Sequence, residues 1–186
     1  MKIRIGLGSC GIAAGAKKVK QAVEQEITAA GLDLTVQQTG CIGMCYNEPL
    51  LDILEDDGTT YTYGHVTEQM VKTIFEEHLK KGRPVEKYLV ATEKPNDFLS
   101  GQVRVALRNC GLIDPEQITD YTDRGGYEAL KQVINMSDLK VIEEIKISGL
   151  RGRGGAGFPT WFKWNAARQN KGDIKYIVCN ADEGDP

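Results

Sequence analysis

The chain has 186 residues, a formal net charge of −3, and 41% hydrophobic and 26% charged residues. This composition is typical of a soluble globular protein of one large or two small domains. The acidic balance, with no basic stripe, argues against a nucleic-acid partner, and no apolar run is long enough for direct membrane insertion. Five cysteines without a secretory signal predict a cytoplasmic protein whose thiols are ligands or buried side chains.

Strand and helix patterns alternate over about the first 90 residues, which predicts an α/β fold. Asp56-Asp57-Gly58 predicts a hairpin turn, and Thr67 is placed to cap the helix that follows. Lys81-Gly82-Arg83-Pro84 is a helix stop signal. The expected elements are strands 3–7, 34–38, 50–54 and 59–63, and helices 13–30 and 67–79.

Three cysteines follow strands in this first part. Cys10 lies in Gly8-Ser9-Cys10-Gly11, and Cys41 and Cys45 form a C-x₃-C loop. Strand ends of a small β/α fold can bring two such loops together. The arrangement resembles the thioredoxin-like [2Fe–2S] ferredoxin, with ligand spacing C-x₄-C and then C-x₃-C. The resemblance implies that Cys10, Cys41 and Cys45 are metal ligands, while Ile5 stands where the fourth thiolate is expected.

This departure leaves two readings open. One is a [2Fe–2S] cluster whose fourth ligand is not cysteine or comes from a partner. The other is a thioredoxin-like domain that has lost its cluster and serves as a docking surface. A disulfide between Cys41 and Cys45 fits the spacing but is not expected to persist in the cytoplasm.

Residues from about 91 to 147 are expected to form a linker and a helical lead-in. The linker composition lies at 92–97, a turn at 111–115, and helices at 127–133 and from Ser137 or Asp138 to Lys146. Cys110 is predicted to be a buried thiol. His65 and His78 are isolated and are interpreted as surface or helix-packing residues.

A glycine-rich stretch, Ser148-Gly-Leu-Arg-Gly-Arg-Gly-Gly-Ala-Gly-Phe-Pro-Thr160, precedes a helix-like segment. Glycines let backbone N–H groups converge on an anion, a helix N-terminus adds further N–H groups, and arginines are bidentate phosphate donors. We therefore expect a phosphate-bearing cofactor held largely by backbone. The alternative is a flexible linker, but linkers do not need Arg, Phe, Pro and Trp in the same few residues.

A short buried strand is expected at 175–179, with Cys179 in the core, and an acidic run extends to Pro186. Because ligands of open α/β sheets bind beyond the carboxyl ends of strands, this run is interpreted as the second wall of a cofactor pocket.

Together, the glycine-rich stretch and Val178-Cys-Asn-Ala-Asp-Glu-Gly-Asp-Pro186 resemble the FMN- and NADH-binding subunit of NADH:quinone oxidoreductase and of NAD-linked hydrogenases. The resemblance implies FMN and NAD(H) as cofactors, with Phe158 and Asp185 near the nicotinamide nucleotide. Trp161 departs from the family, which usually has glycine there. The implied cofactor-binding residues are Gly152, Arg153, Gly154, Gly155, Phe158, Lys163, Asn180, Asp182, Glu183 and Asp185.

The resemblance implies three parts: a thioredoxin-like ferredoxin domain at 1–90, the lead-in at 91–147, and the truncated start of an α/β FMN-binding domain at 148–186. The implied function is hydride transfer from NADH to FMN, followed by single-electron transfer to iron–sulfur clusters. The implied partners are a ferredoxin-like small subunit and an iron–sulfur or hydrogenase large subunit. By itself this piece is expected to be inactive, and the alternative is a truncated, non-catalytic docking module.

Overall fold

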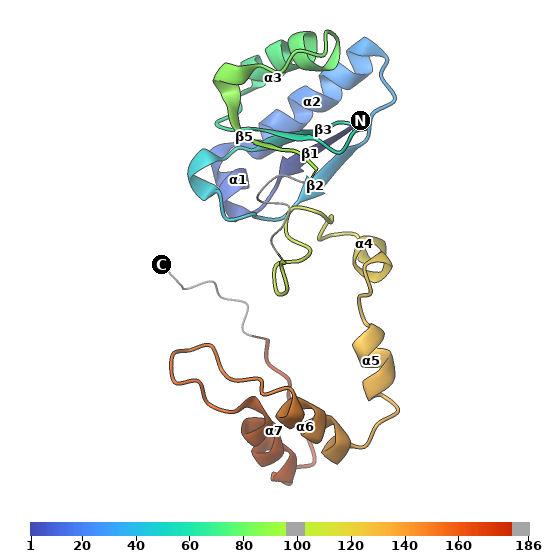
Figure 1. Cartoon of the computed structure of the whole chain (residues 1–186), viewed down its shortest axis with the longest axis vertical. Helices are drawn as coiled ribbons and strands as arrows, with labels where there is room; N and C mark the ends of the chain where they lie inside the picture. Colours follow the sequence, from blue (N-terminus) through green and yellow to red (C-terminus); the bar gives the residue numbers. More distant parts are fainter. Residues whose placement is uncertain (96–102, 180–186) are drawn as a thin grey trace. The chain divides into compact units, whose positions relative to one another are not determined.

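The first strand of the chain, β1 (Lys2–Gly6), lies inside a five-stranded sheet of order β2-β1-β3-β4-β5. The computed structural model describes residues 1–95 and 103–179, which fall into two units, Met1–Gly126 and Tyr127–Pro186. The elements of the first unit are β1, α1 (Ser9–Ala14), α2 (Ala16–Ala30), β2 (Val36–Thr39), η1 (Cys45–Asn47), β3 (Leu51–Leu54), β4 (Thr60–Tyr63), α3 (Glu68–Ile74), η2 (Phe75–Leu79), η3 (Glu86–Tyr88), β5 (Leu89–Glu93) and α4 (Ile118–Asp123) (Figure 1).

The sheet combines one parallel and three antiparallel pairings. Ile3 pairs with Val36 of the parallel neighbour β2 and with Ile53 of the antiparallel neighbour β3. The β4 strand pairs antiparallel with both β3 and β5. A parallel β1–helix–β2 unit followed by an antiparallel hairpin and a helix is the thioredoxin-like arrangement, so the predicted α/β fold of the first part is confirmed.

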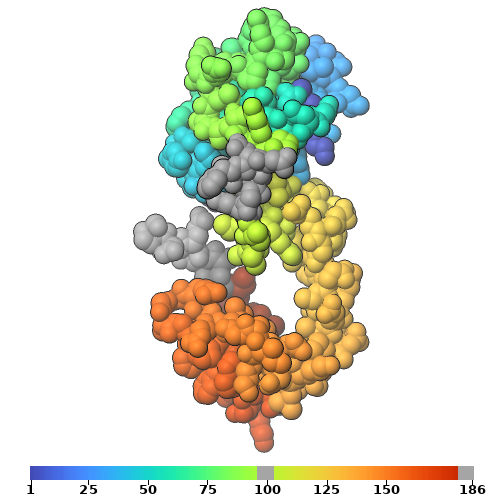
Figure 2. All heavy atoms as spheres, in the orientation of Figure 1, coloured from blue at the N-terminus to red at the C-terminus, as the bar shows by residue number. Residues whose placement is uncertain are grey.

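One face of this sheet is apolar and packs against α2 and α3. Alternate residues of a strand point to the same face, so Ile3 and Ile5 of β1 are both fully buried there. They share the core with side chains of β3, β4, α2 and α3, which include Ile53, Tyr63, Val19, Val23, Val71, Ile74 and Phe75. In Figure 2 the residues coloured blue to green form one closely packed body.

Side chains of β1 and of the edge strand β2 are hydrogen-bonded to the covering segment 103–124, which includes α4. The guanidinium of Arg4 donates a hydrogen bond to the carbonyl oxygen of Gly111. The amide of Gln37 donates to Asp120 Oδ2 at 3.2 Å, and that of Gln38 to Glu116 Oε2 at 2.8 Å. This segment therefore belongs to the first unit, whereas the predicted boundaries at 90 and 147 stay predictions.

The structure of the first unit differs from the sequence prediction in three details: one helix is divided and two elements were not predicted. The expected helix 13–30 is divided at Gly15, whose φ of +106° ends α1, and α2 begins at the next residue. β5 was missed, and it includes Thr92 and Glu93 of the expected linker. The short helix α4 was missed as well.

The second unit contains α5 (Glu128–Val133), α6 (Asp138–Ile147) and α7 (Thr160–Gln169). Ser137 caps α6, as predicted, by accepting a hydrogen bond from the amide of Lys140. Arg168 of α7 forms an ion pair with Asp138 at 3.2 Å. Among the described residues, no helix is long and apolar enough to cross a membrane.

Candidate functional site

The glycine-rich stretch forms a closed loop between α6 and α7. Its two ends meet at an isolated bridge between Arg151 and Pro159. The amide of Gly152 donates to the carbonyl oxygen of Phe158 at 2.8 Å, and the amide of Thr160 donates to that of Leu150 at 3.1 Å. The stretch is therefore curled, and its closure places the loop directly before the first turn of α7.

Three glycines of this loop face open space, and the side chain of Arg151 donates a hydrogen bond across the loop to the carbonyl oxygen of Gly157 at 3.3 Å. Gly155 and Gly157 have positive φ angles of 92° and 58°, which favour glycine. A methyl group added at Gly154, Gly155 or Gly157 would meet no atom within 4 Å. Within the described part of the chain, the backbone amides from Arg153 to Ala156 form no hydrogen bond. Exposed amides in open space are the donors that an anion needs.

Cationic and aromatic side chains stand beside the loop. Lys163, on the first turn of α7, places its ammonium 5.7 Å from the ring centroid of Phe158. Phe158 packs edge-to-face on Phe162, with 5.5 Å between ring centroids. Trp161, the departure from the family, packs on Phe162 and lies under the ammonium of Lys146. The structure thus brings Lys163 and Phe158 together at one loop–helix junction, while cofactor binding by Arg153, Lys163 and Phe158 stays a prediction.

The expected strand 175–179 does not form. These residues have no regular structure, and Ile177 and Val178 are 100% and 87% exposed. Cys179, predicted to fill the core, is exposed. The reason is the missing neighbour, because a strand is stable only when another strand pairs with it and the described residues of this unit include no other strand. Asn180, Asp182, Glu183 and Asp185 lie outside the described residues.

The first unit brings two of its three predicted ligand cysteines together. The Sγ atoms of Cys41 and Cys45 lie 3.5 Å apart, and the amide of Gly43 donates to Cys41 Sγ at 3.3 Å. Gly8, two residues before Cys10, touches the same loop, because a Cβ there would lie 3.1 Å from the Cβ of Cys41. Cys10 itself lies in α1, and the residue before this helix, Gly8, is therefore a neighbour of the C-x₃-C loop.

These thiols do not supply the four ligands of a [2Fe–2S] cluster. Ile5, at the position of the fourth ligand, is fully buried among core side chains. Within residues 1–95 and 103–179, no three His, Cys, Asp or Glu side chains gather into a set that could hold a metal ion. Cys10, Cys41 and Cys45 as ligands stay a prediction, and the described donor set does not fit a four-thiolate cluster.

A buried carboxyl group lies beneath the cysteine loops. Glu48 accepts a hydrogen bond from the amide of Leu50 at 2.9 Å, and burial raises its pKa. Burial also raises the pKa of Asp52, whose Oδ1 is buried and has no hydrogen-bond partner within the described part of the chain. Both carboxyl groups and Ile42 line a cavity of about 10 Å³. That volume is about one water molecule.

The pKa of the Cys41 thiol is raised as well. The hydrogen bond from the Gly43 amide lowers this pKa, but burial and the neighbouring Cys45 and Glu48 raise it and prevail.

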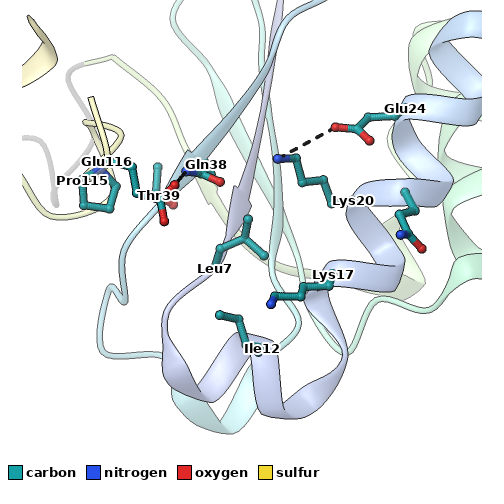
Figure 3. A pocket seen from close by; sticks show the side chains of 10 residues that line it. Leu7, Ile12, Lys17, Lys20, Glu24, Gln38, Thr39, Pro115 and Glu116 are labelled. Carbon is teal, nitrogen blue, oxygen red and sulfur yellow. Dashed lines mark hydrogen bonds and ion pairs between the residues drawn. The ribbon is translucent and has the colours of Figure 1, made fainter. Parts of the chain in front are cut away.

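An open pocket of about 460 Å³ lies where α1, α2, β2 and the covering segment meet (Figure 3). Leu7 and Ile12 supply apolar surface, Lys17 and Lys20 approach from α2, and Glu116 stands on the opposite wall. Lys20 is paired with Glu24 at 3.9 Å. The sequence alone assigns nothing to this pocket, because Glu116 is far from the lysines along the chain.

Comparisons with known proteins found one family model and several relatives that cover part of this chain. Residues 145–186 match the family described as the Nuo51 FMN-binding domain. The chain is 61% identical over 85 residues to the NADP-reducing hydrogenase subunit HndC of Solidesulfovibrio fructosivorans, and 52% identical over 92 residues to an NADH-quinone oxidoreductase subunit of Aquifex aeolicus. These alignments cover 46% and 50% of this chain.

The resemblance predicted from the sequence is thereby confirmed. The chain covers 17% and 21% of the length of those two relatives, about a fifth. Among solved structures, the thioredoxin-like [2Fe–2S] ferredoxin from Aquifex aeolicus is 24% identical, with a TM-score of 0.45. That match covers 55% of this chain and 96% of the ferredoxin.

Proposed function

We propose that this chain is part of an NADH-oxidising flavoprotein subunit, and that its glycine-rich loop binds the phosphate of FMN. One observation carries the proposal: a closed loop with open space at its glycines and exposed amides stands at a helix N-terminus, within the residues that match an FMN-binding domain. The names of the relatives support the oxidoreductase class.

The loop residues fit the phosphate rather than the whole cofactor. Gly154 and Gly155 leave the room that a phosphate needs, Gly152 closes the loop against Phe158, and the exposed amides donate to the phosphate oxygens. Arg153 and Lys163 add charge-assisted hydrogen bonds to the same group. The N-terminus of α7 contributes its dipole. These residues therefore bind and orient the cofactor without taking part in the redox chemistry.

The chemistry that bound FMN supplies is acceptance of a hydride from NADH and release of single electrons to iron–sulfur clusters. Phe158, 43% exposed at the mouth of the loop, is the proposed contact of the nicotinamide nucleotide on this part of the chain. Asn180, Asp182, Glu183 and Asp185 are proposed for the ribityl chain, the flavin ring and the nucleotide. Trp161 stands where the resembled family usually has glycine, and its indole ring reduces the space for the nucleotide on this side of the site.

We further propose that the subunit works in the cytoplasm with a ferredoxin-like small subunit and an iron–sulfur or hydrogenase large subunit. The four-ligand requirement leaves the first unit without a complete [2Fe–2S] site, so no electron-transfer step is assigned to Cys10, Cys41 and Cys45.

The test is a binding titration of the chain with FMN and with riboflavin, which lacks the phosphate. Quenching of flavin fluorescence reports binding. We expect FMN to bind and riboflavin to bind at least about tenfold more weakly, since charge-assisted hydrogen bonds to the phosphate contribute about 1.5–3 kcal/mol. Equal affinity for the two flavins, or no binding of either, would contradict the proposal.

A further inference from the structure

The C-x₃-C loop holds two thiols close together and within reach of solvent. The Sγ atoms of Cys41 and Cys45 are 3.5 Å apart, and Cys45 is exposed while Cys41 is half-buried. We propose that Cys41 and Cys45 form a reversible disulfide, so that this loop is a two-electron thiol–disulfide site. This inference is independent of the flavin proposed for the second unit.

The geometry requires only a small movement. A disulfide bond is about 2.05 Å long, so the two sulfur atoms at 3.5 Å must approach by about 1.5 Å. The loop around them can adjust, because Gly40 and Gly43 have no atom within 4 Å of a Cβ position. Residues 40–44 belong to no helix or strand, and Cys45 is the first residue of the short 3-10 helix η1.

The far side of the loop is held in place while the thiols close. The amide of Asn47 donates to the carbonyl oxygen of Met44 at 2.9 Å, and the carbonyl oxygen of Asn47 accepts from the amide of His65 at 2.7 Å. Ile42 packs against Gly111, where a Cβ would lie 2.6 Å from its Cγ2 atom. These contacts anchor the loop on both sides of Gly43.

Binding of a [2Fe–2S] cluster would compete for these thiols, but the described residues do not supply its four ligands. A [2Fe–2S] cluster needs four ligands, and Ile5 replaces one of them inside the core. Without iron, two thiols in contact are a ready substrate for thiol–disulfide exchange. The ring that they close spans five residues, so the bond adds little stability to the fold and is suited to reversible formation.

The reaction needs an oxidant, and the class that fits is a low-molecular-weight disulfide, RSSR. The exposed Cys45 thiolate attacks RSSR, forms a mixed disulfide and releases RS⁻. The Cys41 thiolate then attacks Sγ of Cys45, which forms the Cys41–Cys45 bond and releases a second RS⁻. Both thiol protons pass through solvent to the two RS⁻ groups, so the protein loses two electrons and two protons and one RSSR becomes two RSH.

The experiment uses the full chain, without added flavin. The protein is equilibrated with mixtures of glutathione and glutathione disulfide, quenched in acid, alkylated and analysed by peptide mass spectrometry. We expect alkylation of Cys41 and Cys45 to be lost together as the disulfide fraction rises, and their peptide to be lighter by two hydrogen atoms. Cys10, Cys110 and Cys179 should remain alkylated under the same conditions. Added dithiothreitol should restore alkylation of the pair.

Two variants sharpen the test. In Cys41→Ser, the mixed disulfide with glutathione should be trapped on Cys45, because the second thiol is gone. Cys110→Ser is the matched control, and its Cys41–Cys45 pair should oxidise as in the parent chain. The parent chain alone decides the question if a variant does not fold.

Three results would overturn the proposal. The first is a Cys41–Cys45 pair that stays fully alkylated at the highest disulfide fraction. The second is a pair that carries only separate glutathione adducts. The third is iron bound to the purified parent chain and lost in Cys41→Ser but not in Cys110→Ser, which would make the pair metal ligands. None of these results bears on FMN binding at the other loop.

Discussion

The phenol oxygen of Tyr63 lies 2.7 Å from Nδ1 of His78, and both side chains are buried in the first unit. The amide of Val85 donates to the same oxygen at 3.2 Å, so the Tyr63 hydroxyl is free to donate its proton to Nδ1. Nε2 of His78 then carries the ring proton and donates to Glu55 Oε1 at 3.1 Å. These hydrogen bonds hold His78 of η2 in its neutral form against Tyr63 of β4.

Removal of the Tyr63 hydroxyl tests this array. In Tyr63→Phe, His78 Nδ1 and the amide of Val85 lose their partner, and we expect the free energy of unfolding to fall by about 1–3 kcal/mol. Urea denaturation at neutral pH measures the loss. Tyr61→Phe is the matched control, since Tyr61 contacts His78 through its ring. Equal effects of the two substitutions would refute the assigned role of the hydroxyl.

The same histidine predicts a pH dependence of stability. Burial lowers the pKa of His78 from 6.5, although Glu55 opposes the shift. The unfolded chain therefore binds this proton more readily, and stability should fall as the pH drops below about 6.5. Denaturation between about pH 8 and about pH 5 measures the slope. His78→Gln should remove it, whereas His65→Gln, an exposed control, should keep it; an unchanged slope in His78→Gln would exclude this cause.

The buried carboxyl group of Glu48 is expected to make the stability of the fold depend on pH in the opposite direction. Its pKa is raised by burial, so the folded chain holds the proton more tightly, and this stabilisation is lost as the pH rises through the folded pKa. Glu48→Gln keeps an oxygen acceptor for the Leu50 amide and removes the buried charge. We expect the variant to gain stability relative to the parent at neutral pH and to gain less near pH 4.5, the ordinary value for glutamate. A gain that is the same at both pH values would mean that the charge is not the cause.

Gly11 of α1 is predicted to be required because a larger side chain has no space there. A Cβ at Gly11 would lie 2.5 Å from the carbonyl oxygen of Gly6 and 3.0 Å from Oε2 of Glu48. Gly11→Ala should therefore cost about 1–3 kcal/mol of unfolding free energy despite the better helix propensity of alanine. Gly40→Ala, where a Cβ meets no atom within 4 Å, should change stability little. Thermal denaturation of both variants gives the comparison, and a fully stable Gly11→Ala would contradict the close approach of Gly11 to Gly6 and Glu48.

The proposed phosphate loop is tested by charge removal. Lys163→Ala and Arg153→Ala should each weaken FMN binding by about tenfold or more, because each removes a charge-assisted contact. Lys171→Ala, an exposed lysine just after α7, is the control and should leave the affinity unchanged. Binding of riboflavin should not respond to any of the three substitutions. Equal losses in all three variants would indicate a general charge effect instead of a site.

Local signals predicted those parts of the fold that depend on neighbouring residues. The turn at Asp57-Gly58 forms with a φ of 87° at Gly58, and Thr67 caps α3 through its hydroxyl. In contrast, β5 depends on pairing with β4 about thirty residues earlier, and its sequence alone reads as part of a linker. The expected strand at 175–179 failed for the same reason in reverse, since a strand pattern does not supply its own neighbour.

The candidate sites divide in the same way. The glycine-rich loop was predicted because its residues are consecutive and their conformational needs are written into the sequence. The contact of Cys41 with Cys45 follows from short spacing. The hydrogen-bonded array of Tyr63, His78 and Glu55 was missed, because the three residues are separate in the sequence and His78 alone shows no pattern.

The hydrogen bonds between the segment 103–124 and side chains of β1 and β2 have a practical consequence for expressing parts of this protein. A version shortened at residue 90 would remove the acceptors that residues 111–120 supply to Arg4, Gln37 and Gln38. It would also cut β5 (Leu89–Glu93) and leave part of β4 without its partner strand. Such a product should be prone to self-association. A cut after Gly126 keeps these contacts and is the better place to separate the two units.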